Sequence, residues 1–308
     1  MNKSSYYFFR YFVHPMQQLK LNFGSSNGEG VTDVKSLLSQ QFFSKLEKDG
    51  KIEYMVRETN FLLYLTRVLD TGTFLCKFAR GLNLKRHTPG EKDIESIIET
   101  NYPYIYIVID KHHQIIMLQK KTTVFRNIDQ AKNSFHSFLV GVIGAAPFEI
   151  SINDITSIQQ FWKCIKEAEA VFYVRFHLKT PNLWGFSEEA SNLLRKVKES
   201  INNTSLELKF ENENGQLHIE KDSLNIGSLA DYASGGGGSW DAKIRRSGET
   251  SPVTVSSREY KRSIQLFSDL ELEEPERIVQ AVREADRAEY DEEPDNEGQS
   301  QAIPGDRR

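Results

Sequence analysis

Residues 170–178 read AVFYVRFHL and carry the clearest secondary-structure signal in the chain. Arg175 and His177 alternate with Phe176 and Leu178, which is the pattern of a β-strand with one buried face. The segments on either side of this strand then decide the fold class.

Residues 147–234 are expected to follow the order βαβαββ. The expected elements are a strand at 148–152, a helix from Asp154, the strand at 170–178, a helix capped by Ser187, strands at 206–210 and 216–219, and a short helix near 224–232. This order is typical of an α/β sandwich such as the ferredoxin-like fold.

Residues 1–146 are expected to form an α+β domain in which antiparallel hairpins alternate with helices. Hairpins are predicted where strands 60–68 and 74–78, and then 104–109 and 114–119, flank short turns. Strands are also predicted at 5–13 and 18–23. Helices are predicted over 34–46 with a stop at Gly50, over 94–98 after the capping-box spacing of Thr88 and Glu91, and over 128–142.

Charge is distributed unevenly along the chain. Residues 268–308 hold 14 acidic side chains and five arginines, whereas residues 1–267 carry a net charge of +5. The acidic tail is predicted to be largely disordered. It contains one short amphipathic helix with an apolar stripe at Ile278, Val279 and Val282, which we expect to bind a protein partner.

Composition and cysteine usage indicate a soluble cytoplasmic protein. Only Cys76 and Cys164 are present, without the spacing of a zinc site or a disulfide framework. No apolar run is long enough to span a bilayer, and Arg10 interrupts the aromatic stretch at 6–13, which therefore does not match a secretory signal. No metal ligand set is predicted.

Most chemical motifs are weak. The glycine-rich loop at 24–30 fails both the Walker and the Rossmann spacing, and Glu29 would repel a phosphate. His112 and His113 are adjacent, so on a strand they would face opposite ways. The absence of a dense catalytic motif favours a non-catalytic protein that needs no cofactor.

The segment 235–267 gives the main functional indication. It opens with Gly235–Gly238 and Ser239, which either let the backbone approach a phosphate chain or act as a linker. The aromatic ring and cations expected to bind nucleic acid are Trp240, Lys243, Arg245, Arg246, Arg258, Lys261 and Arg262.

A metal-dependent nuclease is the first alternative. Such enzymes often place an acid two residues before a lysine on a strand, and Asp241 with Lys243 and Glu207 with Lys209 have this spacing. Mg²⁺ would be required only under this alternative. The second alternative is a protein–protein adaptor or oligomeric scaffold.

The sequence therefore favours a nucleic-acid-binding component of a multi-protein system, for example in bacterial phage defence. In this interpretation the acidic tail either docks a partner or folds back on the basic segment and inhibits binding. Four segments are expected: 1–146, 147–234, 235–267 and 268–308.

Overall fold

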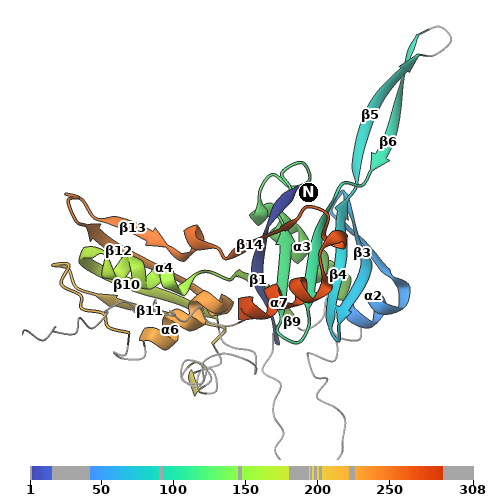
Figure 1. Ribbon diagram of the computed structural model, residues 1–308. Coiled ribbons are helices and arrows are strands. Elements are labelled where there is room, and N and C mark those ends of the chain that lie inside the picture. Colours follow the sequence, from blue (N-terminus) through green and yellow to red (C-terminus); the bar gives the residue numbers. More distant parts are fainter. Residues whose placement is uncertain are drawn as a thin grey trace, which may run out of the picture.

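The computed structural model describes residues 2–15, 42–89, 93–144, 148–179, 194, 196–197, 200, 203–221 and 226–286. In these residues the protein is mostly β. Two antiparallel sheets lie next to each other, and a long two-stranded arm projects from the larger one (Figure 1).

The larger sheet is curled like half a barrel. Its strands follow the order β14-β1-β8-β7-β4-β3-β2, and β9 pairs with the second half of β1. The strands are β1 (Lys3–Pro15), β2 (Lys51–Val56), β3 (Thr59–Asp70), β4 (Thr73–Arg80), β7 (Tyr104–Asp110), β8 (Ile115–Gln119), β9 (Phe148–Asp154) and β14 (Ser263–Phe267).

Helices cover both faces of this sheet. On one face, α2 (Ser44–Asp49) and α3 (Ile128–Ile143) contribute to an aromatic core, where Phe135 of α3 meets Phe78 of β4. On the other face, η4 (Leu270–Leu272) and α7 (Pro275–Asp286) cover a second cluster of apolar side chains. The sheet is therefore the middle of three layers.

Among the described residues, helices cover only one face of the smaller sheet, and its other face is called the open face below. The sheet has the order β11-β10-β12-β13 and consists of β10 (Ala168–Lys179), β11 (Ser205–Glu211), β12 (Gly238–Arg246) and β13 (Val253–Ser256). The helices α4 (Ile158–Lys166) and α6 (Ile226–Tyr232) pack against its core face. A π-helical turn, η2 (Ala233–Gly237), connects α6 to β12, and η3 (Ser257–Tyr260) follows β13.

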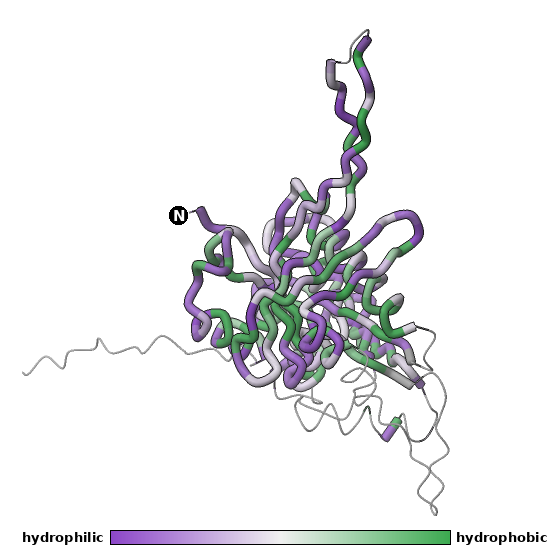
Figure 2. The backbone as a smooth tube through the Cα atoms, turned by 90° about the vertical axis from the view of Figure 1, so that its right-hand side faces the viewer, coloured by the Kyte–Doolittle hydropathy of each residue, from purple (hydrophilic) through white to green (hydrophobic). Residues whose placement is uncertain are grey.

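The arm consists of β5 (Leu82–Pro89) and β6 (Ile94–Asn101), which extend the chain between β4 and β7 away from the body. These two strands form a separate two-stranded sheet. Figure 2 shows hydrophobic segments of the arm far from the core.

The predicted fold class is wrong, because β pairing dominates both halves of the chain. The first half is one curled sheet with α2 and α3 in its described part, not hairpins alternating with helices. The βαβαββ order also fails. β9, the first strand of that order, pairs with β1 in the larger sheet. In the smaller sheet β10 pairs instead with β12, a strand from beyond residue 234. Residues 216–219 make only an isolated bridge from Gln216 to Val171.

One local prediction is also wrong, and the prediction for the tail is confirmed in part. Residues 94–98, predicted as a helix, lie in β6, where their β-branched side chains suit a strand. The amphipathic helix predicted in the tail is present as α7, and with η4 it packs on the larger sheet. The disorder predicted for most of the tail is not tested, because residues 287–308 lie outside the described residues.

Other local predictions are confirmed. Both hairpins form, as β3–β4 and β7–β8, and α3 covers the predicted span. The helix stop at Gly50 is confirmed, since this residue has a left-handed φ of 68° and its N–H donates to the carbonyl of Leu46.

Some predictions are not tested. The strand at 18–23, the loop at 24–30 and the Ser187 cap lie outside the described residues. The four-segment division stays a prediction, although segments 147–234 and 235–267 each supply strands to both sheets. Among the described helices, none combines the length and apolar character needed to cross a membrane.

Candidate nucleic-acid interface

The backbone of the glycine run, residues 235–238, passes very close to two strands, β1 and β10. Gly236 has a φ of +96°, and a Cβ atom there would lie 2.6 Å from the Cβ of Arg10. A Cβ at Gly237 would collide with the ring of Tyr232, and one at Gly238 with the carbonyl of His177. The glycines are thus needed because η2 passes close to β1 and β10.

Arg10 of β1 holds the glycine run in place through a hydrogen bond. Arg10 is 3% exposed, and its guanidinium donates to the carbonyls of Gly235 at 2.6 Å and His113 at 2.9 Å. It also forms an ion pair of 2.8 Å with Asp286, at the end of α7. One buried cation therefore connects β1, the glycine run, the β7–β8 turn and the tail helix.

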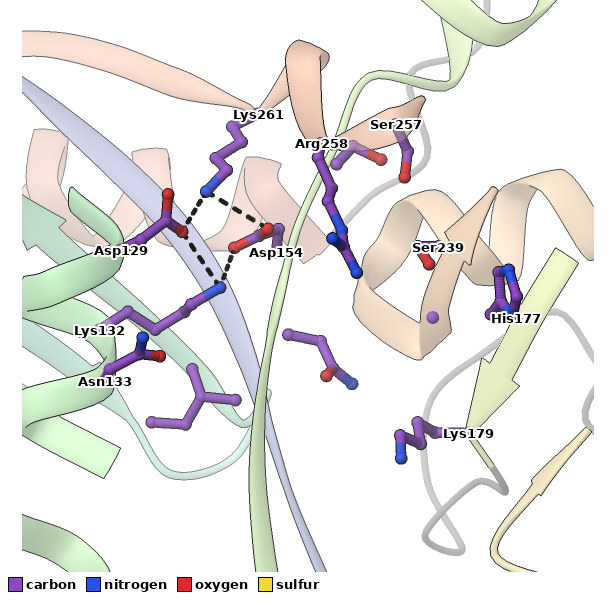
Figure 3. Close-up of a pocket in the computed structure, with 14 residues that line it drawn as sticks. Asp129, Lys132, Asn133, Asp154, His177, Lys179, Ser239, Ser257, Arg258 and Lys261 are labelled. Atoms are coloured by element: carbon purple, nitrogen blue, oxygen red, sulfur yellow. Dashed lines mark hydrogen bonds and ion pairs between the residues drawn. The ribbon is translucent and has the colours of Figure 1, made fainter. Parts of the chain in front are cut away.

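A polar cleft of about 620 Å³ lies where the two sheets meet (Figure 3). The α3 helix, β9 and Lys261 form one wall, and the end of β10, the start of β12 and η3 form the other. The lining residues are Asp129, Lys132, Asn133, Ile152, Asn153, Asp154, Thr156, His177, Lys179, Gly238, Ser239, Ser257, Arg258 and Lys261. Four cationic side chains thus face two carboxylates.

Two of these cations belong to a closed ion-pair network with both carboxylates. Lys132 lies 2.7 Å from Asp154 and 3.4 Å from Asp129. Lys261 contacts the same two acids. Burial acts to raise the pKa of Asp129, but the hydrogen bond from Lys261 and the charges of both lysines outweigh it and hold this pKa below its ordinary value.

The other two cations face the cleft without such partners. Among the described residues, no carboxylate lies within ion-pair distance of Lys179 or Arg258. Thr156 lines the same cleft, is 5% exposed, and its hydroxyl has no hydrogen-bond partner there. The hydroxyl oxygen itself is enclosed by protein atoms, so Thr156 shapes the wall of the cleft without offering this oxygen to a ligand.

The structure places only part of the predicted nucleic-acid site in this cleft. Arg258 and Lys261 line it, together with Gly238 and Ser239. Trp240 does not, since it is 1% exposed and packs between Phe161 and Tyr260 in the core. Its ring is thus unavailable for stacking on a base.

The remaining predicted cations lie elsewhere. Arg245 pairs with Glu169 at 3.2 Å, and Arg246 lies 3.9 Å from Glu249. Lys243 Nζ lies 5.8 Å from the ring centre of Phe172, on the open face of the smaller sheet.

Arg262 donates to the carbonyl of Ala285 at 3.3 Å. It therefore holds the end of α7 next to Lys261 of the cleft.

The residues proposed for a nuclease also lie on this open face, but with protein partners. The guanidinium of Arg175 donates hydrogen bonds of 3.0–3.3 Å to the carboxylate of Asp241. The ring of His177 lies between two carboxylates, Asp241 at 3.2 Å and Glu207 at 3.1 Å. Lys209 pairs with Glu211 at 2.6 Å. In the part of the chain that the structure describes, no three or more His, Cys, Asp or Glu side chains are arranged so that they could hold a metal ion together.

The predicted partner-binding stripe is covered by the chain itself. Ile278, Val279 and Val282 are 1%, 8% and 0% exposed, and α7 packs against the larger sheet. A partner would have to displace the helix to reach them.

Sequence reasoning missed Lys132, Lys179 and Thr156. Each is an isolated polar residue in or beside a regular element, and no local spacing connects them. Comparison of the chain with models of protein families, with curated proteins and with solved structures gives no match.

Proposed function

We propose that the protein binds nucleic acid in the cleft between its two sheets. The observation that carries this proposal is the convergence of Lys179 and Arg258, neither with a carboxylate partner in the described chain, on a polar cleft. Phosphate groups are the natural ligands for such cations, because neutralising them releases counterions.

The cleft favours contact with the backbone of the nucleic acid. Trp240 is buried, and His177 is the only ring among the described lining residues. Without aromatic stacking, affinity comes mainly from phosphate contacts, and we expect weak dependence on base sequence.

In this proposal the protein acts in the cytoplasm as a non-catalytic component of a multi-protein system, with bacterial phage defence as one such setting. Cys76 and Cys164 are free and buried, which suits a reducing compartment. The end of the chain is a candidate inhibitor, since residues 287–308 contain seven acids and three arginines. Their charge is opposite to the excess of cations in the cleft.

The test is fluorescence anisotropy with labelled single-stranded DNA, duplex DNA and RNA, at several salt concentrations. Changing both Lys179 and Arg258 to alanine should weaken binding about tenfold or more and reduce the salt slope by about two, one for each lost phosphate contact. The matched control changes Lys45 and Lys48 to alanine, which removes the same charge from exposed positions in or beside α2.

A chain ending at Asp286 provides the second comparison, because it keeps α7 in place. Tighter binding by this chain supports inhibition by residues 287–308. If the full and shortened chains both fail to bind at low salt, nucleic-acid binding is wrong and the adaptor alternative gains weight. Shortening of the probe only when Mg²⁺ is present would instead support the nuclease.

A further inference from the structure

Both strands of the arm expose large apolar side chains, Leu84 on β5 and Ile94, Ile97 and Ile98 on β6. Every residue of β6 is exposed, with Ile94 at 69% and Ile98 at 70%. An isolated two-stranded hairpin is only marginally stable in water, and both edges of this one carry unpaired backbone groups. A third strand would satisfy one edge and cover these side chains.

The two edges of the arm differ in their suitability for a third strand. Along one face of β6 and the residue after it, alternate positions are Ile94, Ser96, Ile98, Thr100 and Tyr102. All five are uncharged, and four of them favour strands. In contrast, β5 presents Lys85, Arg86 and His87 in succession, on both faces of the ribbon, whereas the two charges of β6, Glu95 and Glu99, lie on its opposite face only. Charged edge strands resist pairing, so β6 is the open edge.

We propose that two copies of this chain join through their β6 strands, antiparallel and centred on Ile98. In this register Ile98 faces its own copy, Ser96 faces Thr100, and Ile94 faces Tyr102 of the second copy. The exposed apolar side chains thereby meet across the axis. On the opposite face Ile97 faces Glu99, so no two carboxylates lie directly opposite.

The neighbouring register is unfavourable. Centring the pair on Ile97 sets Glu95 directly opposite Glu99 of the second copy, twice per dimer, and like charges in that position destabilise a sheet. The register centred on Ile98 also limits the assembly to two copies. It yields a four-stranded sheet with β5 at both outer edges, where the basic side chains oppose further addition, so a two-fold dimer results.

Light scattering coupled to size-exclusion chromatography tests this on the full chain. The wild-type chain should form a dimer whose fraction rises with concentration. Ile98→Lys places two ammonium groups at the axis and should weaken the dimer more than about tenfold. Leu84→Lys, on the outer strand of the same arm, should leave it unchanged. A wild-type chain that stays monomeric, or a dimer equally strong with Ile98→Lys, overturns the proposal.

A covalent test covers the case in which Ile98→Lys unfolds the arm. The native cysteines are buried, so a cysteine at position 98 would be the accessible thiol among the described residues. Under mild oxidation Ile98→Cys should form a disulfide-linked dimer, and Leu84→Cys should not. Equal cross-linking of the two variants would mean that the arms collide at random, and the proposal would fail. The outcome does not depend on nucleic-acid binding.

Discussion

The two sheets are built from strands with different patterns, and the difference shows what each sheet needs. In the larger sheet, β8 is buried at every position and β7 at every position except Tyr104. In the smaller sheet, β11 alternates between exposed and partly buried residues along its whole length. A strand that is apolar throughout needs a cover on each side, whereas an alternating strand needs only one.

This comparison shows that part of the acidic tail is a structural element of the fold. α3 covers one face of the larger sheet, and the second cover comes from α7, at the far end of the chain. The first half of the tail therefore belongs to the fold, and its acidic side chains take part in it: Glu273 is 5% exposed and accepts a hydrogen bond from the N–H of Phe267, and Asp286 pairs with Arg10. Removing the whole tail would therefore lower the stability of the fold, whatever role the tail has in regulating binding.

The largest expected effect is the loss of this second cover. A chain ending at Phe267 loses the burial of Ile278, Val279 and Val282, at about 1.5–3 kcal/mol for each side chain. We expect a loss of about 5 kcal/mol or more, comparable with the whole stability of many domains. Urea unfolding followed by circular dichroism measures it. A chain ending at Asp286 is the control, and similar midpoints for the two chains would contradict the three-layer description.

A smaller effect should separate the two faces of the smaller sheet. Trp240→Ala empties the core between Phe161 and Tyr260 and should cost about 3–5 kcal/mol. Tyr173→Ala, on the open face, should cost less than about 1 kcal/mol. Both variants are compared by chemical denaturation. Equal losses would show that the open face is covered after all.

The smallest effect concerns the ion pairs of Asp129 in the cleft between the two sheets. Because the pKa of Asp129 is lowered in the folded protein, its carboxylate stabilises the fold at neutral pH. This contribution declines as the pH falls below the ordinary carboxyl pKa of about 4 and is lost once the pH falls below the lower pKa of the folded state. Its side chain is half exposed, so Asp129→Asn should cost less than about 1 kcal/mol at pH 7. Unfolding measurements at pH 7 and pH 3 should show a smaller difference in acid. A cost that is the same at pH 3 as at pH 7 would assign another role to Asp129.

Local patterns predicted many elements but failed where two signals competed. At 94–98, the spacing of Thr88 and Glu91 suggested a helix start, but Ile94, Ile97 and Ile98 favour a strand, and pairing with β5 decided the outcome. In the tail, composition suggested disorder, and the narrow stripe of α7 was read as a surface for another protein. The larger sheet of the same chain buries it instead.

The candidate site was harder to predict than the elements. Arg258 and Lys261 were identified because they lie in a basic segment. Trp240 was assigned to the surface by the same composition argument, although a single aromatic in a strand is equally suited to a core. Lys132 and Lys179 had no local signal, because their relation to the cleft depends on how α3 and β10 are placed.

The sequence by itself determined the positions of most strands, the helix over 128–142, two hairpins and the stop at Gly50. These depend on side-chain alternation and backbone conformation over a few residues. Only the tertiary structure decided that β9 leaves the smaller sheet, that α7 covers the larger one, and that Asp129 meets Lys261 across 132 residues of chain. Such pairings are selected by the burial and charge compensation of the whole molecule, which no short stretch of sequence contains.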